Sequence, residues 1–194
     1  MMLPPASSYA ALVAGFRWDL PARLNMGVQA SDTWAERAPD ALALIDLSRP
    51  ARRDWTHGAL NRLVRRVQAT LAARGVAPGD RVGVLLSQSA LCAAAHLAIW
   101  RMGAVSVPLF TLFRAEALRT RIADSGLRIV VTDDANAPAA AAQGAEPLTE
   151  ADMAAPTDAP PADTGPETPA CLIYTSGTTG APKGALHGHR MLTG

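Results

Sequence analysis

The spacing of apolar residues predicts an amphipathic helix over residues 57–74. Its apolar positions recur at intervals of three and four residues and are Leu60, Leu63, Val64, Val67 and Leu71. Residues at this spacing share one face of a helix, and Arg62, Arg65 and Arg66 fall on the other side, where we expect them to be solvated. Thr56 suits the N-cap position and Gly75 the C-terminal stop, so both ends of the helix are predicted as well.

Short apolar runs between turn residues predict the strands of a sheet. The expected strands are Ala41–Leu47, Arg81–Leu86, Val105–Val107 with Pro108 ending it, Leu127–Thr132, 170–175 and Gly184–Leu186. Further helices are expected over Asn25–Arg37, Ser89–Met102 and Arg114–Asp124. This alternation of strands and helices is typical of an α/β fold in which helices cover parallel sheets.

Composition divides the chain into regions of different character. Residues 1–23 form an irregular lead-in, and residues 24–194 form one domain. Within this domain, residues 135–169 are rich in Ala, Pro, Thr, Asp and Glu and poor in large apolar side chains. Such a segment cannot bury much apolar surface, so we expect a mobile surface connection between two strands.

Composition and charge exclude several classes of protein. Hydrophobic residues make up 49% of the 194-residue chain and charged residues 18%, which favours a packed core over disorder. The net charge of +1 gives no electrostatic reason to expect nucleic acid as a partner. Polar side chains interrupt the most apolar stretch, residues 82–100, and no secretory signal opens the chain. We therefore expect a cytoplasmic protein without a membrane span, in which Cys92 and Cys171 are buried free thiols.

The most informative segment is the polar loop that follows the expected strand at 170–175. It combines hydroxyl donors, glycines and one cation, namely Thr175, Ser176, Gly177, Thr178, Thr179, Gly180 and Lys183. Glycines let successive backbone N–H groups surround an anion, hydroxyls add rotatable donors, and lysine adds a compact positive charge. The loop therefore predicts a polyphosphate-binding site. A plain surface turn with a solvated lysine is the alternative, and the buried strand before the loop argues against it.

This loop is not the P-loop of NTPases. The P-loop ends in Gly-Lys-Ser/Thr, whereas Lys183 stands between Pro182 and Gly184. No Gly-x-Gly-x-x-Gly fingerprint occurs in the sequence, so the usual argument for a dinucleotide-binding fold is missing. The sequence therefore gives no support for a P-loop NTPase or for a dinucleotide-binding fold.

Three segments taken together resemble the first three core motifs of the AMP-forming adenylating enzymes. They are Trp55–Leu60, Trp100–Pro108 and the loop from Thr175 to Gly184. This superfamily contains acyl-CoA synthetases, adenylation domains of peptide synthetases and firefly luciferase. Phe16–Trp18, Pro108–Phe113 and Ala185–Arg190 make the chain look most like a short- or medium-chain acyl-CoA synthetase, and an aryl-CoA ligase could carry similar residues.

The resemblance implies a ligase reaction in two halves. A carboxylic acid and ATP give an acyl-adenylate and pyrophosphate, and the thiol of coenzyme A then takes the acyl group and releases AMP. Thr175 to Gly180 would bind the β- and γ-phosphates, Lys183 would be catalytic by neutralising their charge, and Thr175 would help to bind Mg²⁺. The implied partners are therefore small molecules, namely a carboxylic acid, ATP and coenzyme A.

The resemblance covers about residues 24–194 and extends no further than the third motif. The later family motifs supply the adenine and ribose contacts, an acidic Mg²⁺ ligand and a C-terminal lid domain, and they have no counterpart in this sequence. We therefore expect an incomplete N-terminal domain of an acyl-CoA synthetase-like fold that is inactive alone. Two alternatives stay open: adenylation for the thiol of a carrier protein, and a non-catalytic nucleotide-binding remnant.

Two pairs of polar residues allow more than one interpretation. His187 and His189 are too few ligands for a zinc site, and a role for them near the nucleotide rests on family position alone. Asp133 and Asp134 follow an expected strand, where α/β proteins often bind ligands. For this pair a solvated turn is the favoured interpretation.

Overall fold

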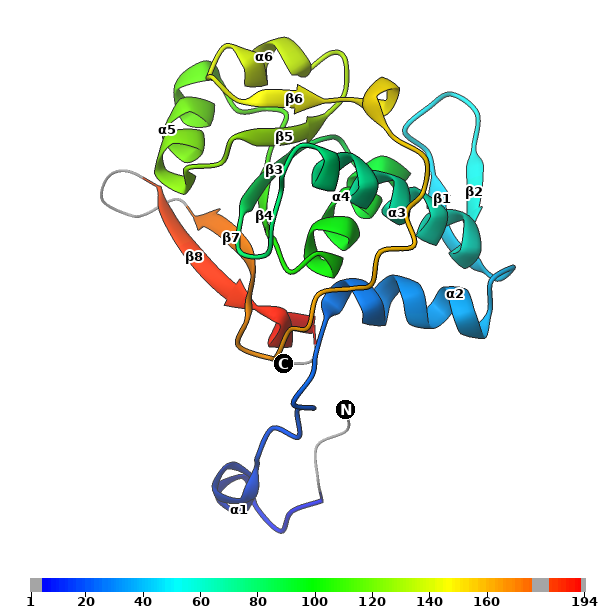
Figure 1. The fold of residues 1–194 in the computed structure, drawn as a ribbon. Coiled ribbons are helices and arrows are strands. Elements are labelled where there is room, and N and C mark those ends of the chain that lie inside the picture. The colour runs from blue at the N-terminus through cyan, green and yellow to red at the C-terminus, as the bar shows by residue number, and fades with distance from the viewer. Residues whose placement is uncertain (1–4, 176–181, 193–194) are drawn as a thin grey trace.

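A six-stranded sheet forms the centre of the computed structural model, which describes residues 5–175 and 182–192 (Figure 1). Its strands are β3 (Arg81–Leu85), β4 (Val105–Leu109), β5 (Ile129–Thr132), β6 (Glu146–Leu148), β7 (Pro169–Thr175) and β8 (Lys183–Gly188). They follow the order β6-β5-β3-β4-β7-β8, and all neighbouring pairs are parallel except β7 and β8. A separate antiparallel hairpin consists of β1 (Leu42–Asp46) and β2 (Arg53–Thr56). The predicted α/β fold is confirmed, with a mixed and mostly parallel sheet.

Helices pack on both faces of this sheet. The helices of the described residues are α1 (Tyr9–Gly15), the π-helix η1 (Val28–Asp32), α2 (Thr33–Arg37), α3 (His57–Ala73), α4 (Ala90–Arg101), α5 (Ala115–Ser125), α6 (Ala137–Ala141) and the 3-10 helices η2 (Glu150–Asp152) and η3 (His189–Leu192). One core packs α3 and α4 against Val82 and Val84 of β3, and a second packs α5 and α6 against Leu85. Because successive side chains of a strand point to opposite faces, the two cores lie on opposite sides of the sheet.

The helix predicted over residues 57–74 is α3, and all of its predicted apolar positions are buried. The Oγ1 atom of Thr56 accepts a hydrogen bond from the backbone N–H of Ala59 at 3.2 Å, which confirms the predicted N-cap. Gly75 follows the helix with φ of 76°, a left-handed conformation that glycine adopts without a steric cost. Both ends of this helix were therefore correctly predicted from local sequence.

Residues 135–169 differ from the surface connection expected from their composition. They contain α6 and β6, and Ala140, Leu148 and Met153 are buried in this segment. A short strand and a row of alanines bury little apolar area per residue. The composition of this segment therefore did not indicate that α6 and β6 pack against the domain. The longest stretch of this segment without helix or strand is residues 153–168.

Residues 153–168 cross part of the arginine-bearing face of α3, where they cover Arg65 and Arg66, whereas Arg62 is exposed as expected. The Nε atom of Arg66 donates a hydrogen bond to the carbonyl of Ala154 at 3.1 Å, and Nη1 of Arg65 donates to the carbonyl of Thr157 at 3.4 Å. The expectation of a solvated face was therefore wrong at these two residues. Their partners lie far along the chain, where a helical periodicity cannot reveal them.

Strand β4 continues through Pro108, whereas the sequence predicts its end at Val107. Leu109 is 3% exposed and belongs to the core on the α5 side, so its burial keeps the chain extended past the proline. A proline near a strand end removes at most one hydrogen bond of the ladder.

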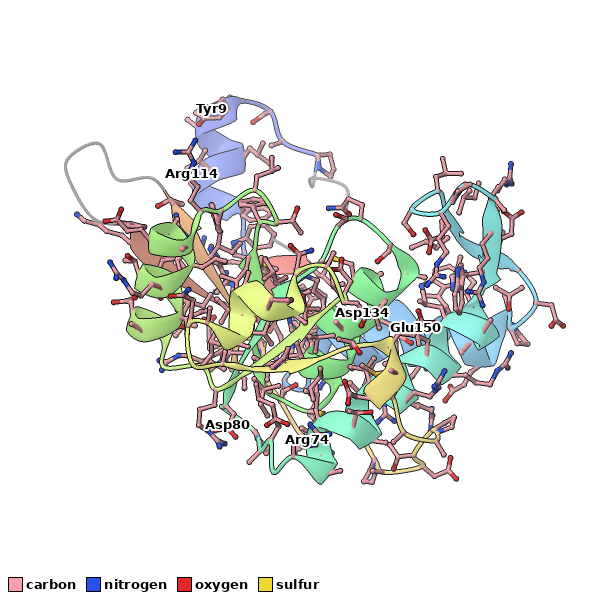
Figure 2. All side chains as sticks on the ribbon, turned by 90° about the horizontal axis from the view of Figure 1, so that it is seen from above. Tyr9, Arg74, Asp80, Arg114, Asp134 and Glu150 are labelled. Carbon is pink, nitrogen blue, oxygen red and sulfur yellow. The ribbon has the colours of Figure 1, made fainter. Side chains whose placement is uncertain are left out.

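The segment before the domain contains a helix that was not predicted. This helix is α1, which has no buried residue and carries the exposed side chain of Tyr9. It stands apart from the sheet and its covering helices (Figures 1 and 2).

The helix expected over Asn25–Arg37 is present as η1 followed by α2. It approaches α4 closely at Gly27, where an added Cβ atom would lie 2.5 Å from the carbonyl oxygen of Leu97. Because a Cβ atom has no room there, glycine is needed for this helix contact.

Both cysteines are free thiols, with Cys92 half-buried and Cys171 buried. Burial raises the pKa of each thiol, which disfavours the reactive thiolate. No helix within residues 5–175 or 182–192 has the length and apolar character needed to cross a membrane.

Candidate functional site

The two ends of the predicted phosphate loop meet across the β7–β8 hairpin. Thr175 is the last residue of β7 and Lys183 the first of β8, and they are partners in the antiparallel ladder. Both residues are exposed. The structure therefore places a hydroxyl and an ammonium group at the same end of one hairpin. The loop residues between them that carry the remaining predicted donors, Ser176, Gly177, Thr178, Thr179 and Gly180, lie outside the described residues.

Strand β7 gives this hairpin a firm base. Its residues Cys171 and Leu172 are buried, and Cys171 pairs with Ser106 of β4 inside the parallel sheet. Strand β8 packs closely on it, since an added Cβ at Gly184 would lie 2.9 Å from Cδ1 of Leu172. The base of the loop is therefore held by the main sheet.

Lys183 is the only lysine in the sequence. In the part of the chain that the structure describes, no carboxylate forms an ion pair with it. Its ammonium charge is therefore available to an anion at the end of the hairpin. A compact ammonium with three donors suits a phosphate oxygen as a point charge.

The two histidines after the loop have different positions. His189 is fully buried, and its Nδ1 accepts a hydrogen bond from the backbone N–H of Met26 at 3.0 Å. Burial lowers the pKa of His189 to about 4, so this ring is neutral and has a structural role. His187 is half-buried near the end of β8. Among the described residues, no group of three or more His, Cys, Asp or Glu side chains could hold a metal ion.

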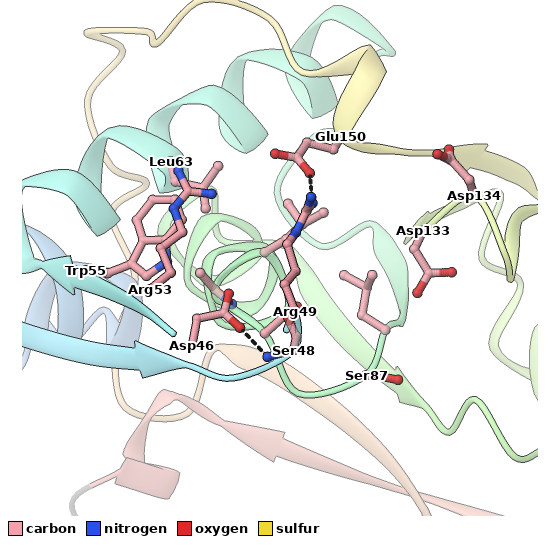
Figure 3. A pocket seen from close by; sticks show the side chains of 14 residues that line it. Asp46, Ser48, Arg49, Arg53, Trp55, Leu63, Ser87, Asp133, Asp134 and Glu150 are labelled. Carbon is pink, nitrogen blue, oxygen red and sulfur yellow. Dashed lines mark hydrogen bonds and ion pairs between the residues drawn. The ribbon is translucent and has the colours of Figure 1, made fainter. Parts of the chain in front are cut away.

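A cavity of about 340 Å³ opens at the carboxyl ends of β3 and β5 (Figure 3). Its polar and aromatic lining consists of Asp46, Ser48, Arg49, Arg53, Trp55, Ser87, Ser89, Asp133, Asp134 and Glu150. The chain leaves β3 toward β4 and leaves β5 toward β6, in opposite directions across the sheet. Such a switch point is where open α/β sheets often bind ligands. The sequence pattern does not reveal this cavity, because it does not predict β2 and η2, which complete the cavity wall.

Several of the charged groups in this cavity already have partners. The carboxylate of Asp46 accepts a hydrogen bond from the N–H of Ala90 at 3.0 Å, at the start of α4. Burial opposes its ionisation, but hydrogen bonds from Ser48 and Ala90 outweigh burial and lower the pKa of Asp46. Arg49 pairs with Glu150 at 2.8 Å, as the dashed line in Figure 3 shows.

The predicted turn after β5 is present at the edge of this cavity. The Oδ1 atom of Asp133 accepts a hydrogen bond from the backbone N–H of Asn136 at 2.9 Å, which builds the turn. Asp134 is exposed and, like Glu150, lines the cavity (Figures 2 and 3). The structure thus supports the turn interpretation for this pair of aspartates.

Known proteins resemble the chain in sequence and in fold. The family model described as AMP-binding enzyme matches residues 31–194. An acetyl-coenzyme A synthetase of Magnetococcus marinus is 33% identical over 207 residues, covering 88% of this chain and 32% of its own length. A probable non-canonical nonribosomal peptide synthetase of Salinispora arenicola is 38% identical over 161 residues, covering 80% of this chain and 2% of its own length. The crystal structure of an acyl-CoA synthetase from Brucella canis matches with a TM-score of 0.81 and 27% identity, over 94% of this chain and 38% of that one.

These matches agree with the motifs and with the mostly parallel sheet. The chain spans about a third of the length of the acetyl-coenzyme A synthetase, at 32%. The matched region includes the described ends of the phosphate loop, Thr175 and Lys183, and the sheet that carries them. The chain therefore belongs to the AMP-binding enzyme family, as its three core motifs predicted.

Proposed function

We propose that this chain forms the N-terminal, phosphate-holding part of an AMP-forming acid–CoA ligase. The observation that carries the proposal is the pairing of Thr175 with Lys183 at the exposed end of the β7–β8 hairpin. This pairing brings a hydroxyl donor and an ammonium group, which has no ion-pair partner among the described residues, to the two ends of a loop rich in hydroxyls and glycines. Membership of the AMP-binding enzyme family supports the nucleotide as the ligand.

In the proposed first half-reaction, a carboxylate oxygen attacks the α-phosphorus of ATP and the bond to the β,γ-pyrophosphate breaks. Negative charge gathers on the leaving pyrophosphate, so the protein contributes through positioning and electrostatic stabilisation. Lys183 neutralises part of this charge, while the Thr175 hydroxyl donates a hydrogen bond to it. In the second half-reaction, the thiol of coenzyme A attacks the acyl carbon and AMP leaves with the bonding electrons.

Mg²⁺ fits this proposal through the chemistry of its ligands. The ion prefers oxygen ligands and commonly binds phosphate oxygens together with one or two protein oxygens. The exposed hydroxyl of Thr175 is such an oxygen at the end of β7. Bound there with the nucleotide, Mg²⁺ would offset the charge of the phosphates.

A carrier-protein thiol is the second candidate acceptor. The nonribosomal peptide synthetase from Salinispora arenicola, at 38% identity, favours it. The acetyl-coenzyme A synthetase matches over a larger share of this chain, 88% against 80%, which supports coenzyme A. Since the chain spans 32% of that synthetase, we propose that the 194 residues alone do not catalyse acid-dependent exchange of pyrophosphate into ATP.

The single lysine allows a direct test of the phosphate site. Limited acetylation of the purified chain modifies only two kinds of amine, the Lys183 side chain and the amino terminus. We expect magnesium pyrophosphate to slow acetylation of Lys183, measured by peptide mass spectrometry, and to leave the amino terminus unaffected. Magnesium sulfate at equal ionic strength is the control. Equal rates of Lys183 acetylation with and without pyrophosphate would contradict the proposed role of the hairpin.

A further inference from the structure

A single short hydrogen bond links the phosphate-binding end of β7 to helix α5. The hydroxyl of Tyr174 donates to Oδ2 of Asp124 at 2.5 Å. This distance falls in the range of charge-assisted O–H···O⁻ bonds, which are about twice as strong as neutral ones. Tyr174 directly precedes Thr175 in the chain. The bond therefore acts one residue away from the first predicted phosphate ligand.

The Tyr174 hydroxyl remains a donor across the physiological pH range. Burial of the ring and the neighbouring Asp124 carboxylate raise the pKa of Tyr174 to about 12. The tyrosine is 9% exposed. A neutral phenol facing a carboxylate can only donate, so the direction of this hydrogen bond is defined.

Arg121 restrains the same tyrosine ring from a second position on α5. Its guanidinium carbon lies 5.8 Å from the centroid of the Tyr174 ring and 4.1 Å from that of Phe113. Arg121 is 8% exposed, and its Nη1 donates to the carbonyl of Ala117 at 2.8 Å. A cation over a ring face is attracted by the ring quadrupole, more strongly when water is excluded. Helix α5 therefore holds both the hydroxyl and the face of this ring.

The ring also lies against the strand that begins with Lys183. Tyr174 and Gly184 are partners in the β7–β8 ladder, and an added Cβ at Gly184 would lie 3.4 Å from Cε1 of Tyr174. A displacement of the ring would therefore push on Gly184, the residue next to Lys183. Through this contact, α5 is coupled to both ends of the phosphate loop.

From this geometry we infer that Asp124 and Tyr174 are positioning residues for phosphate binding. Their hydrogen bond holds the end of β7 so that Thr175 and Lys183 keep the spacing that a pyrophosphate group requires. The inference rests on the proposed function, because it assigns these residues to the same phosphate site. Neither residue needs to touch the ligand.

Four variants of the 194-residue chain separate positioning from general stability. Y174F removes the hydroxyl and keeps the ring, and D124A removes the acceptor. D124N keeps a neutral oxygen acceptor, so it should restore most of the binding. E116A removes an exposed carboxylate from the first turn of the same helix and is the matched control.

The affinity for magnesium pyrophosphate, measured by titration calorimetry, is the first readout. We expect Y174F and D124A each to weaken binding about tenfold, which corresponds to about 1.4 kcal/mol. A fifth variant, which combines Y174F with D124A, should bind no more weakly than either single variant, because both changes remove the same hydrogen bond. D124N and E116A should bind within about threefold of the unchanged chain. Equal affinity in all variants, or additive losses in the double variant, would overturn the inference.

Hydrogen exchange of the unliganded chain is the second readout. Loss of the Tyr174–Asp124 bond should speed exchange in peptides that contain Thr175 and Lys183 in Y174F and D124A, but not in E116A. This measurement does not require pyrophosphate to bind. If the unchanged chain fails to bind pyrophosphate, the proposed function fails, and hydrogen exchange still decides the coupling. Unchanged exchange in both peptides would refute the coupling itself.

Discussion

The backbone N–H of Met26 donates a hydrogen bond to Nδ1 of His189 over 3.0 Å. This bond joins the first helical segment of the domain to the residue that follows β8. Both residues are fully buried, with 0% exposure. The chain just after β8 is thus fastened to the start of the domain, which lies more than a hundred residues earlier in the sequence.

We expect the free energy of unfolding to fall in acid because of two histidines, His96 and His189. Burial lowers the pKa of His189 and of His96 to about 4 from an ordinary value of 6.5. Between these values the unfolded chain binds protons that the folded chain does not, so the free energy of unfolding falls as the pH falls. Each histidine contributes about 1.4 kcal/mol per pH unit in this window. Urea unfolding at pH 7, 6 and 5 measures this slope.

His96→Leu provides the control for this slope. His96 is partly buried beside Trp100, where an apolar side chain is tolerated, and it has no part in the Met26 contact. We expect this variant to lose the proton uptake of one histidine, so its stability should depend less steeply on pH between 6.5 and 4. An identical slope in the variant would show that His96 is protonated equally in both states.

The buried ion pair between Arg101 and Asp32 predicts a large loss of stability when one partner is removed. Nε of Arg101 donates to Oδ2 of Asp32 at 2.9 Å, and Arg101 is 2% exposed. Asp32→Ala leaves a buried guanidinium without its carboxylate, which typically costs about 3–5 kcal/mol. Equilibrium denaturation by urea measures the change. Asp54→Ala, which removes the exposed partner of Arg52, should leave the unfolding midpoint nearly unchanged.

Close helix packing at Gly27 predicts that even a methyl group is destabilising. A Cβ there would lie 2.5 Å from the carbonyl oxygen of Leu97 and 2.6 Å from the backbone nitrogen of Arg101. Because the obstructing atoms are backbone, relief requires the helices to move apart. We expect Gly27→Ala to lower stability by about 3 kcal/mol. Thermal unfolding measures this loss. Gly15→Ala is the control and should have little effect on thermal unfolding, because no atom lies within 4 Å of the added Cβ.

We expect the proposed first half-reaction to slow when the positive charge of Lys183 is removed. We expect Lys183→Ala to reduce ATP–pyrophosphate exchange about 10²–10³-fold in the complete ligase that we propose, as for loss of one preorganised donor. Arg62→Ala removes an exposed positive charge from α3 and should leave exchange unchanged. An exchange rate in Lys183→Ala close to that of the unchanged enzyme would exclude the lysine from the mechanism.

Local elements and the family were predictable from the sequence. The period of apolar residues defined α3, and Thr56 and Gly75 defined its ends, because caps and helical faces depend on residues within a few positions of each other. The three core motifs identified the AMP-binding enzyme family for the same reason, since each is a contiguous run of residues.

Contacts between distant segments were decided by the tertiary structure alone. The partners of Arg66 and Arg101 lie dozens of residues away, and so does the Asp124 acceptor of Tyr174. The cavity at β3 and β5 likewise depends on elements from separate parts of the chain. Composition described residues 135–169 as a surface connection, yet β6 pairs with β5 there. The pattern of residues indicates which face of a helix or strand is apolar. Which other segment packs against that face depends on the path of the whole chain.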